Sequence, residues 1–458
     1  MTWLAHDMLS AISLSIYEYR KYLVLTLAIS LIAIPIADIL VIQRDRNRNE
    51  MYGEAFWIYG FEIYNMNDTV LVDKIDDLHP EWNFDDGEHV LPDYLENVNY
   101  EYPVFGLFFF AIATWLFPGA GGLQQLWLNF LLVLVFNLNL VLLAILLRDK
   151  IKTKFWARMF FGGYFIYGIA MSAGGGKLEP IVDCLLLMSI VLWTEKQHGK
   201  AMFALGLGVQ TKIYPAVAFP FFFLGNPVSS VWFFLSMGMS VIPTLFGASF
   251  ESLVSHFLNT SSYSAYIVNP LYPELIWSTP DFTTEPTTFY TWFPAMIPLV
   301  IYVFYVLLTV RPYLPSRSDL EGKSIWLKLV ELKPFYLYML PGVLFVFRWV
   351  MPWYLYWLSI VVVLFDKNEH AIGYMKIITV VGLLYLFGIL CSWPYFISGP
   401  LPDFFAHFPL QWWMTLAGLI VLGFASAIAY NVWKWEFDRR ERKAVLQREA
   451  EARGELLI

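Results

Sequence analysis

Apolar residues occur along this chain in long runs that recur from one end to the other. A helix needs about 20 mostly apolar residues to cross the hydrocarbon core of a bilayer. The runs that are apolar enough to cross are 22–42, 122–147, 158–173, 178–193, 229–247, 289–310, 334–350, 352–365, 373–394 and 411–433. The stretch 201–225 contains Lys212 and Pro215, so we expect two short helices that meet near one membrane face. The pattern predicts an all-α polytopic membrane protein with about twelve transmembrane helices.

Composition supports this class and excludes several others. Hydrophobic residues make up 58% of the 458 positions and charged residues only 15%, whereas soluble domains carry about 25% charged residues. A soluble enzyme, a disordered chain and a disulfide-stapled secreted module are therefore excluded. The net charge of −8 gives no basic footprint, so we expect no nucleic-acid partner. Cys184 and Cys391 both lie in apolar runs, where we expect packed core residues and no metal ligands.

Lysine and arginine are concentrated in four polar segments, which should face the cytoplasm because basic loops stay inside. These segments are 148–158, 194–200, 311–333 and 434–458. The loops 248–288 and 395–410 contain no Lys or Arg and should face outwards. We expect a multi-pass plasma-membrane protein with both termini cytoplasmic, a single transmembrane domain over 1–433 and a charged cytoplasmic tail over 434–458.

The alternation of cytoplasmic and outer loops is consistent along the chain only if the short apolar piece 103–118 does not cross the membrane. This piece must begin and end on the outer side, as a re-entrant or membrane-surface segment. If it crossed instead, the basic loop 148–158 would lie outside, against the charge rule.

Residues 43–102 form the one large polar region, an outer loop between the first two spans with fifteen acidic and four basic residues. Its helical apolar stripe consists of Tyr52, Ala55, Phe56, Tyr59 and Ile63. Such a stripe is typical of a helix that lies on a membrane surface. Just before the stripe, Arg44, Arg46 and Arg48 offer guanidinium groups that suit phosphate oxygens, or that anchor the chain at the headgroups. Binding of a divalent cation by the carboxylates of the acidic run 73–88 stays an open alternative, although the spacing of these residues matches no calcium loop.

Charged residues also lie within or beside the apolar runs, where each costs about 2.5–3.5 kcal/mol at a helix centre. They are Asp38, Lys177, Glu179, Lys212 and Arg348. For each of them a snorkelling side chain or a buried ion pair is the simpler explanation. Lys212 has apolar neighbours and a helix-breaking proline three residues later, so we expect an anionic partner. That partner is either Glu179 or a substrate phosphate.

Several short motifs follow one another in the first half of the chain. They are the surface helix with Tyr52 and Ala55, the segment Tyr100-Glu101-Tyr102-Pro103, the turn Gly176-Lys177-Leu178-Glu179-Pro180 and the segment Gln210-Thr211-Lys212-Ile213-Tyr214-Pro215. Their order resembles the GT-C superfamily of polytopic glycosyltransferases, and in particular its polyprenyl-phosphate-mannose-dependent mannosyltransferase-like branch. The resemblance covers roughly residues 22–225, with an aromatic segment at 352–357 beyond it. Val104 replaces a proline of the pattern, and the position of the usual acidic residue falls on Asn47 or Arg48.

The resemblance implies a GT-C-like membrane enzyme with its site on the outer face. It would move a hexose, with mannose favoured, from polyprenyl or dolichyl phosphate to a lipid-linked or glycan acceptor, with inversion. A carboxylate would act as general base, with Asp45 the first candidate and Glu50 the second. The residues that would bind the donor phosphate are Lys212, Arg348, Arg44 and Arg46. Those that would line the site or contact the acceptor are Glu101, Tyr102, Glu179, Tyr214, His256 and Tyr354.

The sequence requires no cofactor, and it leaves two other functions open. A transporter or lipid flippase would also place charges at broken helices. The second alternative is a non-catalytic GT-C-like membrane subunit, because Asn47 or Arg48 stands where the family usually has an acidic residue. The single long outer loop with its surface helix, and the lack of a detectable repeat, favour the transferase over a transporter.

Overall fold

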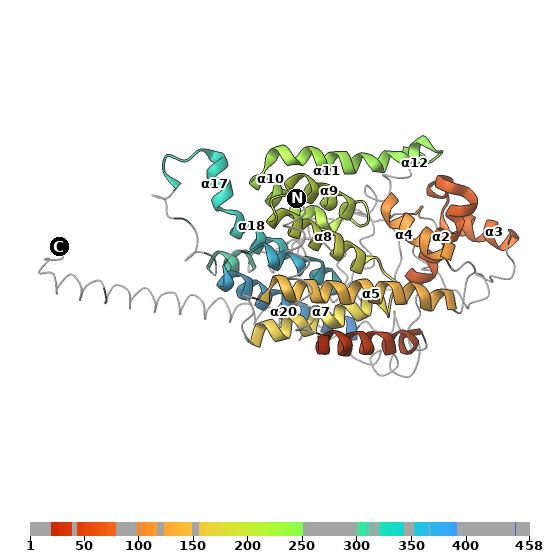
Figure 1. Ribbon diagram of the computed structural model, residues 1–458, viewed down its shortest axis with the longest axis horizontal. Coiled ribbons are helices and arrows are strands. Elements are labelled where there is room, and N and C mark those ends of the chain that lie inside the picture. The colour runs from red at the N-terminus through yellow and green to blue at the C-terminus, as the bar shows by residue number, and fades with distance from the viewer. Residues whose placement is uncertain are drawn as a thin grey trace, which may run out of the picture. The chain divides into compact units, whose positions relative to one another are not determined.

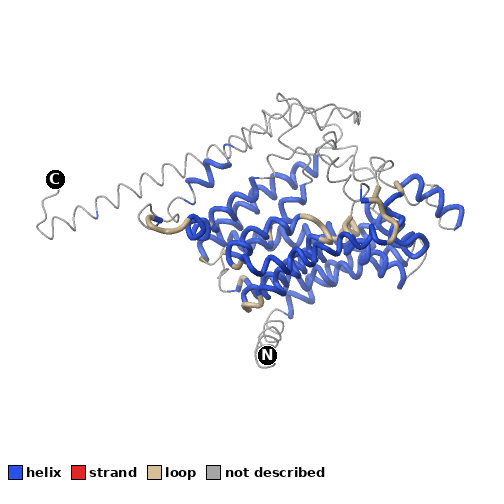
Figure 2. The backbone as a smooth tube through the Cα atoms, turned by 90° about the horizontal axis from the view of Figure 1, so that it is seen from above, coloured by secondary structure: helices blue, strands red, loops and turns tan. Residues whose placement is uncertain are grey.

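In the computed structural model, the described part of the chain is mostly helical, with loops and turns between the helices (Figures 1 and 2). The described residues are 20–38, 44–78, 99–100, 102–116, 123–148, 155–250, 300, 302–308, 310, 315, 320–342, 352–365, 367–391 and 445. Within these ranges there is no strand, only an isolated bridge between Asn67 and Asn99. The expected helical class is confirmed to that extent.

The chain divides into two compact units. The first contains 1–266, 280–285 and 351–408, and the second contains 267–279, 286–350 and 409–458. In the second unit the named elements are α17 (Ile325–Glu331), α18 (Lys333–Met339) and η8 (Leu340–Gly342). The hydroxyl of Tyr302, from the helical stretch 302–308, donates a 2.6 Å hydrogen bond to the carbonyl of Tyr338. All the described candidate residues below lie in the first unit.

Long helices form the body of the first unit, where they run side by side in both views (Figures 1 and 2). They are the helix Arg20–Asp38, α5 (Leu123–Leu146), α7 (Phe155–Ser172), α8 (Glu179–Thr194), α9 (His198–Val209), α11 (Ser230–Met237) and α20 (Asn368–Cys391). Short elements complete it: η4 (Tyr214–Ala218), α10 (Phe219–Gly225), η5 (Pro227–Ser229), η6 (Gly238–Val241), α12 (Ile242–Leu245), η9 (Pro352–Leu358) and η10 (Ile360–Leu364).

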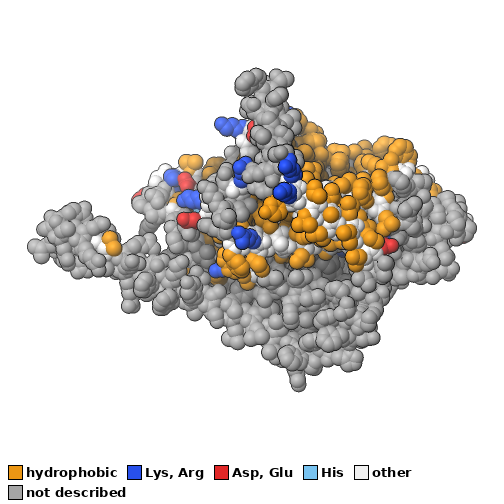
Figure 3. Space-filling model, turned by 60° about the horizontal axis from the view of Figure 1, so that its bottom comes forward, with side chains coloured by type: hydrophobic (Ala, Val, Ile, Leu, Met, Phe, Trp, Pro, Cys, Tyr) orange, Lys and Arg blue, Asp and Glu red, His pale blue; other side chains and the backbone are white. Residues whose placement is uncertain are grey.

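Within the described ranges, three helical stretches are long and apolar enough to cross a membrane. They are Arg20–Asp38, Leu126–Leu146 and Pro227–Leu245. Apolar side chains cover one broad surface, with lysine and arginine gathered at one of its sides (Figure 3). On α11, for example, Val231 and Phe234 are 65% and 61% exposed, which suits contact with lipid and would be costly in water.

The break predicted inside 201–225 is present. The amides of Thr211 and Lys212 bond back to the carbonyl of Gly208 and end α9, and the chain restarts as η4 with Pro215 in its first turn. A proline is tolerated there because the first turn has no internal acceptor for its missing amide. The stretch expected as one span at 352–365 differs, because it consists of the two 3₁₀ segments η9 and η10.

The helices α7, α8 and α9 alternate in direction. The side-chain amide of Asn129, near the start of α5, donates to the carbonyl of Ala173, just past the end of α7. At the opposite end of the helices, Trp193 of α8 packs on Phe222 of α10 with ring centroids 4.6 Å apart. The turn between α7 and α8 and the break after α9 therefore lie at one end, and the basic loop 194–200 lies at the other.

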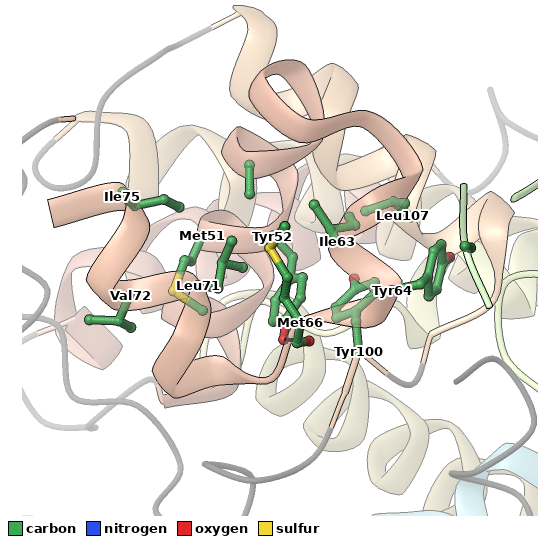
Figure 4. Packing of buried hydrophobic residues seen from close by; sticks show 12 residues of the cluster. Met51, Tyr52, Ile63, Tyr64, Met66, Leu71, Val72, Ile75, Tyr100 and Leu107 are labelled. Carbon is green, nitrogen blue, oxygen red and sulfur yellow. Dashed lines mark hydrogen bonds between the residues drawn. The ribbon is translucent and has the colours of Figure 1, made fainter. Parts of the chain in front are cut away.

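The long loop contains a helix where one was expected, α2 (Arg44–Tyr59), followed by η1 (Gly60–Asn65) and α3 (Asp68–Leu78). Its residues from Arg46 to Ala55 are all buried, including those outside the predicted stripe, so this half of the helix lacks the one-sided burial expected at a membrane surface. The helix begins earlier than its apolar stripe, so the arginine cluster forms its first turns and does not precede it. Its buried stripe is the centre of a packed core (Figure 4). The core residues are Met51, Tyr52, Ala55, Ile63, Tyr64, Met66, Leu71, Val72, Ile75, Tyr100, Leu107 and Ala248.

The apolar piece 103–118 forms α4 (Val104–Leu116), which packs along α2. Gly53 permits the close approach, because a Cβ atom there would lie 2.8 Å from the carbonyl oxygen of Phe110. The indole of Trp57 donates a 2.7 Å hydrogen bond to the carbonyl of Ala111. Thirteen helical residues rise about 20 Å, which is shorter than the core of about 30 Å.

Candidate functional site

The first turns of α2 bury charge beside the end of the helix Arg20–Asp38. The guanidinium of Arg46 pairs with the Asp38 carboxylate at 3.0 Å, and the Arg46 side chain is only 5% exposed. Asp38 is the partly exposed member of the pair. Arg46 is therefore held in an ion pair, not spread into solvent as a simple anchor would be.

Glu50 lies one turn further along α2 and is 2% exposed. Neither of its carboxylate oxygens has a hydrogen-bond partner among the described residues. Burial raises the pKa of this carboxyl to about 8, because water no longer solvates the charged form. Arg46 opposes that shift, while the neighbouring carboxylates of Glu54 and Asp38 add to it. Glu50 is thus a basic carboxylate close to a cation.

Arg48 has a different role from the one expected for the arginine cluster. Its Nε atom lies 2.6 Å from a carboxylate oxygen of Asp68, and both side chains are 2% exposed. The Tyr52 hydroxyl also donates to Asp68, at 2.9 Å, and the Arg48 guanidinium lies 5.0 Å from the ring centroid of Tyr52. This buried pair joins α3 to α2.

The glycine-rich turn between α7 and α8 lies directly against Arg46. Gly176 has a positive φ of 56°, and a Cβ atom there would lie 2.6 Å from Cγ of Arg46. A glycine is needed both for the left-handed backbone and for the close approach. The amide of Lys177 then bonds to the carbonyl of Met171 at 2.9 Å, which closes α7. The turn places Glu179 at the start of α8.

The second buried pair joins Glu179 to Lys212, as expected for one of the two alternatives. The Lys212 ammonium lies 2.8 Å from Oε1 of Glu179, with side chains 16% and 0% exposed. The indole of Trp357 donates to the same oxygen at 3.2 Å. Lys212 also lies 4.9 Å from the ring centroid of Trp357 and 5.4 Å from that of Tyr102, both within range of cation–π attraction.

The segment 100–105 connects the two pairs. The ring of Tyr102 packs beside Tyr100 at 5.6 Å, and Tyr100 stacks on Tyr52 of α2 at 4.2 Å. On the other side, the amide of Phe105 donates to the carbonyl of Gln210 at 3.1 Å. Segments that are far apart in the sequence are therefore neighbours at one end of the helices.

The predicted site residues divide into three groups. Those brought together by described contacts are Arg46, Glu50, Tyr102, Glu179, Lys212, Tyr214 and Tyr354. Tyr214 and Tyr354 both stack on Trp357, with centroids 4.8 Å and 3.7 Å away. Arg44 and Asp45 are the first residues of α2, and their side chains lie outside the described part. Glu101, His256 and Arg348 lie outside the described residues.

One buried carboxylate was missed by the sequence reasoning. Asp183 is 1% exposed and accepts hydrogen bonds from the hydroxyls of Tyr164 and Tyr214. The available signal was a carboxylate inside an apolar run, four residues after Glu179 and so on the same helix face. No group of three or more His, Cys, Asp or Glu residues that could hold a metal occurs in the described ranges.

Comparison of the chain with protein-family models, with curated proteins and with solved structures found no match.

Proposed function

We propose that the protein is a polytopic membrane glycosyltransferase. It moves a hexose, with mannose the first candidate, from a polyprenyl or dolichyl phosphate to a lipid-linked or glycan acceptor. One observation carries the proposal. The buried carboxylate of Glu50 beside Arg46 and the ion pair of Lys212 with Glu179 lie at the same end of the helices, where the Gly176 turn that precedes Glu179 packs against Arg46. This supplies both signs of charge beside apolar helices, as a charged lipid carrier requires.

Glu50 is the proposed general base. An acceptor hydroxyl must lose its proton as its oxygen attacks, and a positioned carboxylate with a raised pKa is a stronger base than an exposed one. Glu50 has that raised pKa and two carboxylate oxygens with no partner in the described part of the chain. Asp45, one turn earlier on α2, stays the second candidate.

Lys212 and Arg46 are the proposed phosphate ligands. When the sugar leaves, negative charge grows on the phosphate oxygen, and a fixed cation there stabilises the transition state more than the ground state. Glu179 and Asp38 hold these two cations in place at 2.8 Å and 3.0 Å. Each cation remains able to bind an oxygen anion, since ammonium and guanidinium groups carry several donors.

The proposed reaction is a single displacement with inversion. The acceptor oxygen forms a bond to the anomeric carbon while the bond from that carbon to the phosphate oxygen breaks. The hydroxyl proton passes to the Glu50 carboxylate, and the bonding electron pair leaves with the carrier phosphate. No oxidant, nucleotide or cofactor is consumed.

We further propose a multi-pass plasma-membrane topology with about twelve spans and cytoplasmic termini. The support is that the basic loop 194–200 lies at the end of the helices away from the candidate site. The positive-inside rule then puts the site on the outer face.

The test uses purified protein in lipid vesicles with polyprenyl-phosphate-mannose carrying a radiolabel. Wild-type protein should release the carrier phosphate and pass label to a glycan or lipid-linked acceptor. Glu50→Gln should lower the rate by about 10²-fold or more, as removal of a general base does. Glu62→Gln is the matched control, an exposed glutamate in η1 of the same loop.

Other results would assign another function. Movement of the labelled lipid across the vesicle membrane without sugar transfer would indicate a flippase. No transfer and no movement, with intact folding, would leave the non-catalytic subunit. Full activity of Glu50→Gln with an inactive Asp45→Asn would move the base to Asp45.

A further inference from the structure

We propose that Asp183 is a positioning residue, which holds the ion pair of Lys212 and Glu179 in register through Tyr214. Its effect on turnover rests on the function proposed above, but its effect on Lys212 does not. The carboxylate is buried in α8 and has no part in the transfer chemistry.

The two oxygens of Asp183 serve two different elements. Oδ2 accepts a 2.9 Å hydrogen bond from the hydroxyl of Tyr164 on α7. Oδ1 accepts a hydrogen bond from the hydroxyl of Tyr214 on η4, which follows the break after α9. Those two tyrosines are the only hydrogen-bond donors to Asp183 within the described ranges. A carboxylate kept in an apolar helix with both oxygens satisfied has a specific task, because burial without such partners is costly.

The contact to Tyr214 reaches the candidate site through Trp357. The ring of Tyr214 stacks on the indole of Trp357 with centroids 4.8 Å apart and planes 12° apart. That indole donates to Oε1 of Glu179, the oxygen that Lys212 also binds. The Tyr214 hydroxyl lies 3.4 Å from the backbone carbonyl of Glu179 as well.

The position of Tyr214 affects Lys212 because the two residues are close together in the chain. Tyr214 is two residues after Lys212, and the backbone between them is the irregular break between α9 and η4. Such a break has no continuous helical hydrogen bonding to fix its position. The bond from Tyr214 to Asp183 ties the break to α8, one turn from Glu179. Asp183 therefore sets where the Lys212 ammonium lies relative to its partner.

Tyr164 provides the matched control. It donates to the same carboxylate from the other side, and within the described ranges its ring packs on Phe136 and Tyr167, not on Trp357. Tyr164→Phe and Tyr214→Phe each remove one hydroxyl from Asp183. Only the second removes the tie to the break. A purely structural role for Asp183, as a joint between helices, predicts equal effects from the two variants.

The first measurement follows Lys212 itself. Protein in detergent is treated with a limiting amount of an amine-reactive reagent, and modification of Lys212 is quantified by mass spectrometry against Lys200, which is exposed at the other end. Tyr214→Phe and Asp183→Asn should raise the relative rate at Lys212 by about fivefold, the factor expected for loss of one hydrogen bond. Tyr164→Phe should leave it near the wild-type value. Equal rates in all four proteins overturn the proposal.

The second measurement is turnover. Tyr214→Phe should lower kcat by about tenfold or more, since small misplacements of binding groups have such effects, while Tyr164→Phe keeps a near-normal kcat per folded molecule. Equal losses of kcat in both variants, in proportion to lost thermal stability, would show a structural joint. If the wild-type protein has no transferase activity, the proposed function is wrong. The role of Asp183 is still decided, because the labelling of Lys212 measures it independently of turnover.

Discussion

At the residue scale, charge is buried in matched sets. Lys212 meets Glu179, Arg46 meets Asp38 and Arg48 meets Asp68. Taking a charge out of water is expensive unless a partner and hydrogen bonds compensate it, so these residues occur as pairs. Glu50 differs from these residues, because both its carboxylate oxygens lack a hydrogen-bond partner within the described part of the chain. Its raised pKa of about 8 places its change of charge near neutral pH.

The transfer rate should follow the protonation of Glu50. Its pKa is raised from 4.5 to about 8 by burial, so the carboxyl is mostly protonated at neutral pH. A base must first lose its own proton, and kcat/KM should therefore rise with pH and level off above that value. Initial rates measured between pH 5.5 and 9 will show this. A rate that is flat across this range would contradict Glu50 as the base.

The stability of the protein should change in the opposite direction. Between pH 4.5 and 8 the folded protein keeps the Glu50 proton while the unfolded chain has lost it. Stability from this group is therefore full below pH 4.5 and falls by up to about 1.4 kcal/mol for each pH unit until the folded carboxyl ionises. Glu50→Gln should remove this loss, so the variant should have the higher thermal midpoint at pH 8 and gain little at pH 4.5.

Lys212 should affect both stability and transfer, and a double variant separates the two. Lys212→Ala leaves the Glu179 carboxylate buried without its cation, which typically costs about 3–5 kcal/mol. Lys212→Met combined with Glu179→Gln removes both charges and should regain most of the thermal stability. It should still transfer sugar about 10²-fold more slowly, because no cation is left for the leaving phosphate. Normal transfer by the double variant would exclude Lys212 as a phosphate ligand.

Lys212→Arg tests the geometry of the cation. The charge is kept, but a planar fork replaces a compact ammonium in a space bounded by Tyr102 and Trp357. Partial recovery of the rate relative to Lys212→Ala is expected in the same assay.

At the element scale, close helix contacts position the site. The helices α2 and α4 approach at Gly53, and the turn before α8 approaches α2 at Gly176. These contacts let α2 carry Arg46 and Glu50 towards Glu179. These two glycines thus set how closely α2 approaches its neighbours, and so where Arg46 and Glu50 lie.

Gly53→Ala should therefore separate α2 from α4. The added Cβ would lie 2.8 Å from the Phe110 carbonyl oxygen, and a backbone atom in a packed helix cannot move aside freely. Overpacking of this kind costs about 1–3 kcal/mol. Gly162→Ala is the control, a glycine in the middle of α7 where nothing lies within 4 Å of the added atom. Thermal unfolding in detergent should show a loss for the first variant and no loss for the second.

At the scale of the whole molecule, the apolar surface indicates contact with lipid, and the position of the basic loops predicts the orientation in the membrane. Helices long and apolar enough to cross are present, and their exposed side chains suit lipid better than water. Which end faces the cytoplasm follows only from the positive-inside rule, so it needs its own measurement.

Cysteine labelling in intact cells will test this orientation. Cys184 and Cys391 are first replaced by alanine, and a single cysteine is introduced at exposed Asp77 of α3 or at exposed Lys200 of α9. A membrane-impermeant maleimide should label the Asp77→Cys protein in intact cells and the Lys200→Cys protein only after permeabilisation. The reverse pattern would place the candidate site on the cytoplasmic side.

The sequence alone determined the features that depend on neighbouring residues. Runs of apolar residues predicted helices, and Tyr52, Ala55 and Ile63 of the predicted apolar stripe are buried in the core around α2. The break near Lys212 followed from Pro215, and the cost of an isolated charge predicted an anionic partner, either Glu179 or a substrate phosphate, of which Glu179 is the one paired with Lys212 in the structure. Each of these rests on local chain geometry or on the solvation of a single group, both of which can be judged from a short window.

Only the tertiary structure decided which partners the remaining groups have. Asp68 pairs with Arg48, and Trp357 reaches Glu179 from 178 positions away in the sequence. The burial of Glu50 and the two tyrosines on Asp183 also depend on how helices pack. Local patterns do not contain this information, because burial and hydrogen bonding at these groups are set by elements that the chain brings together only when it folds.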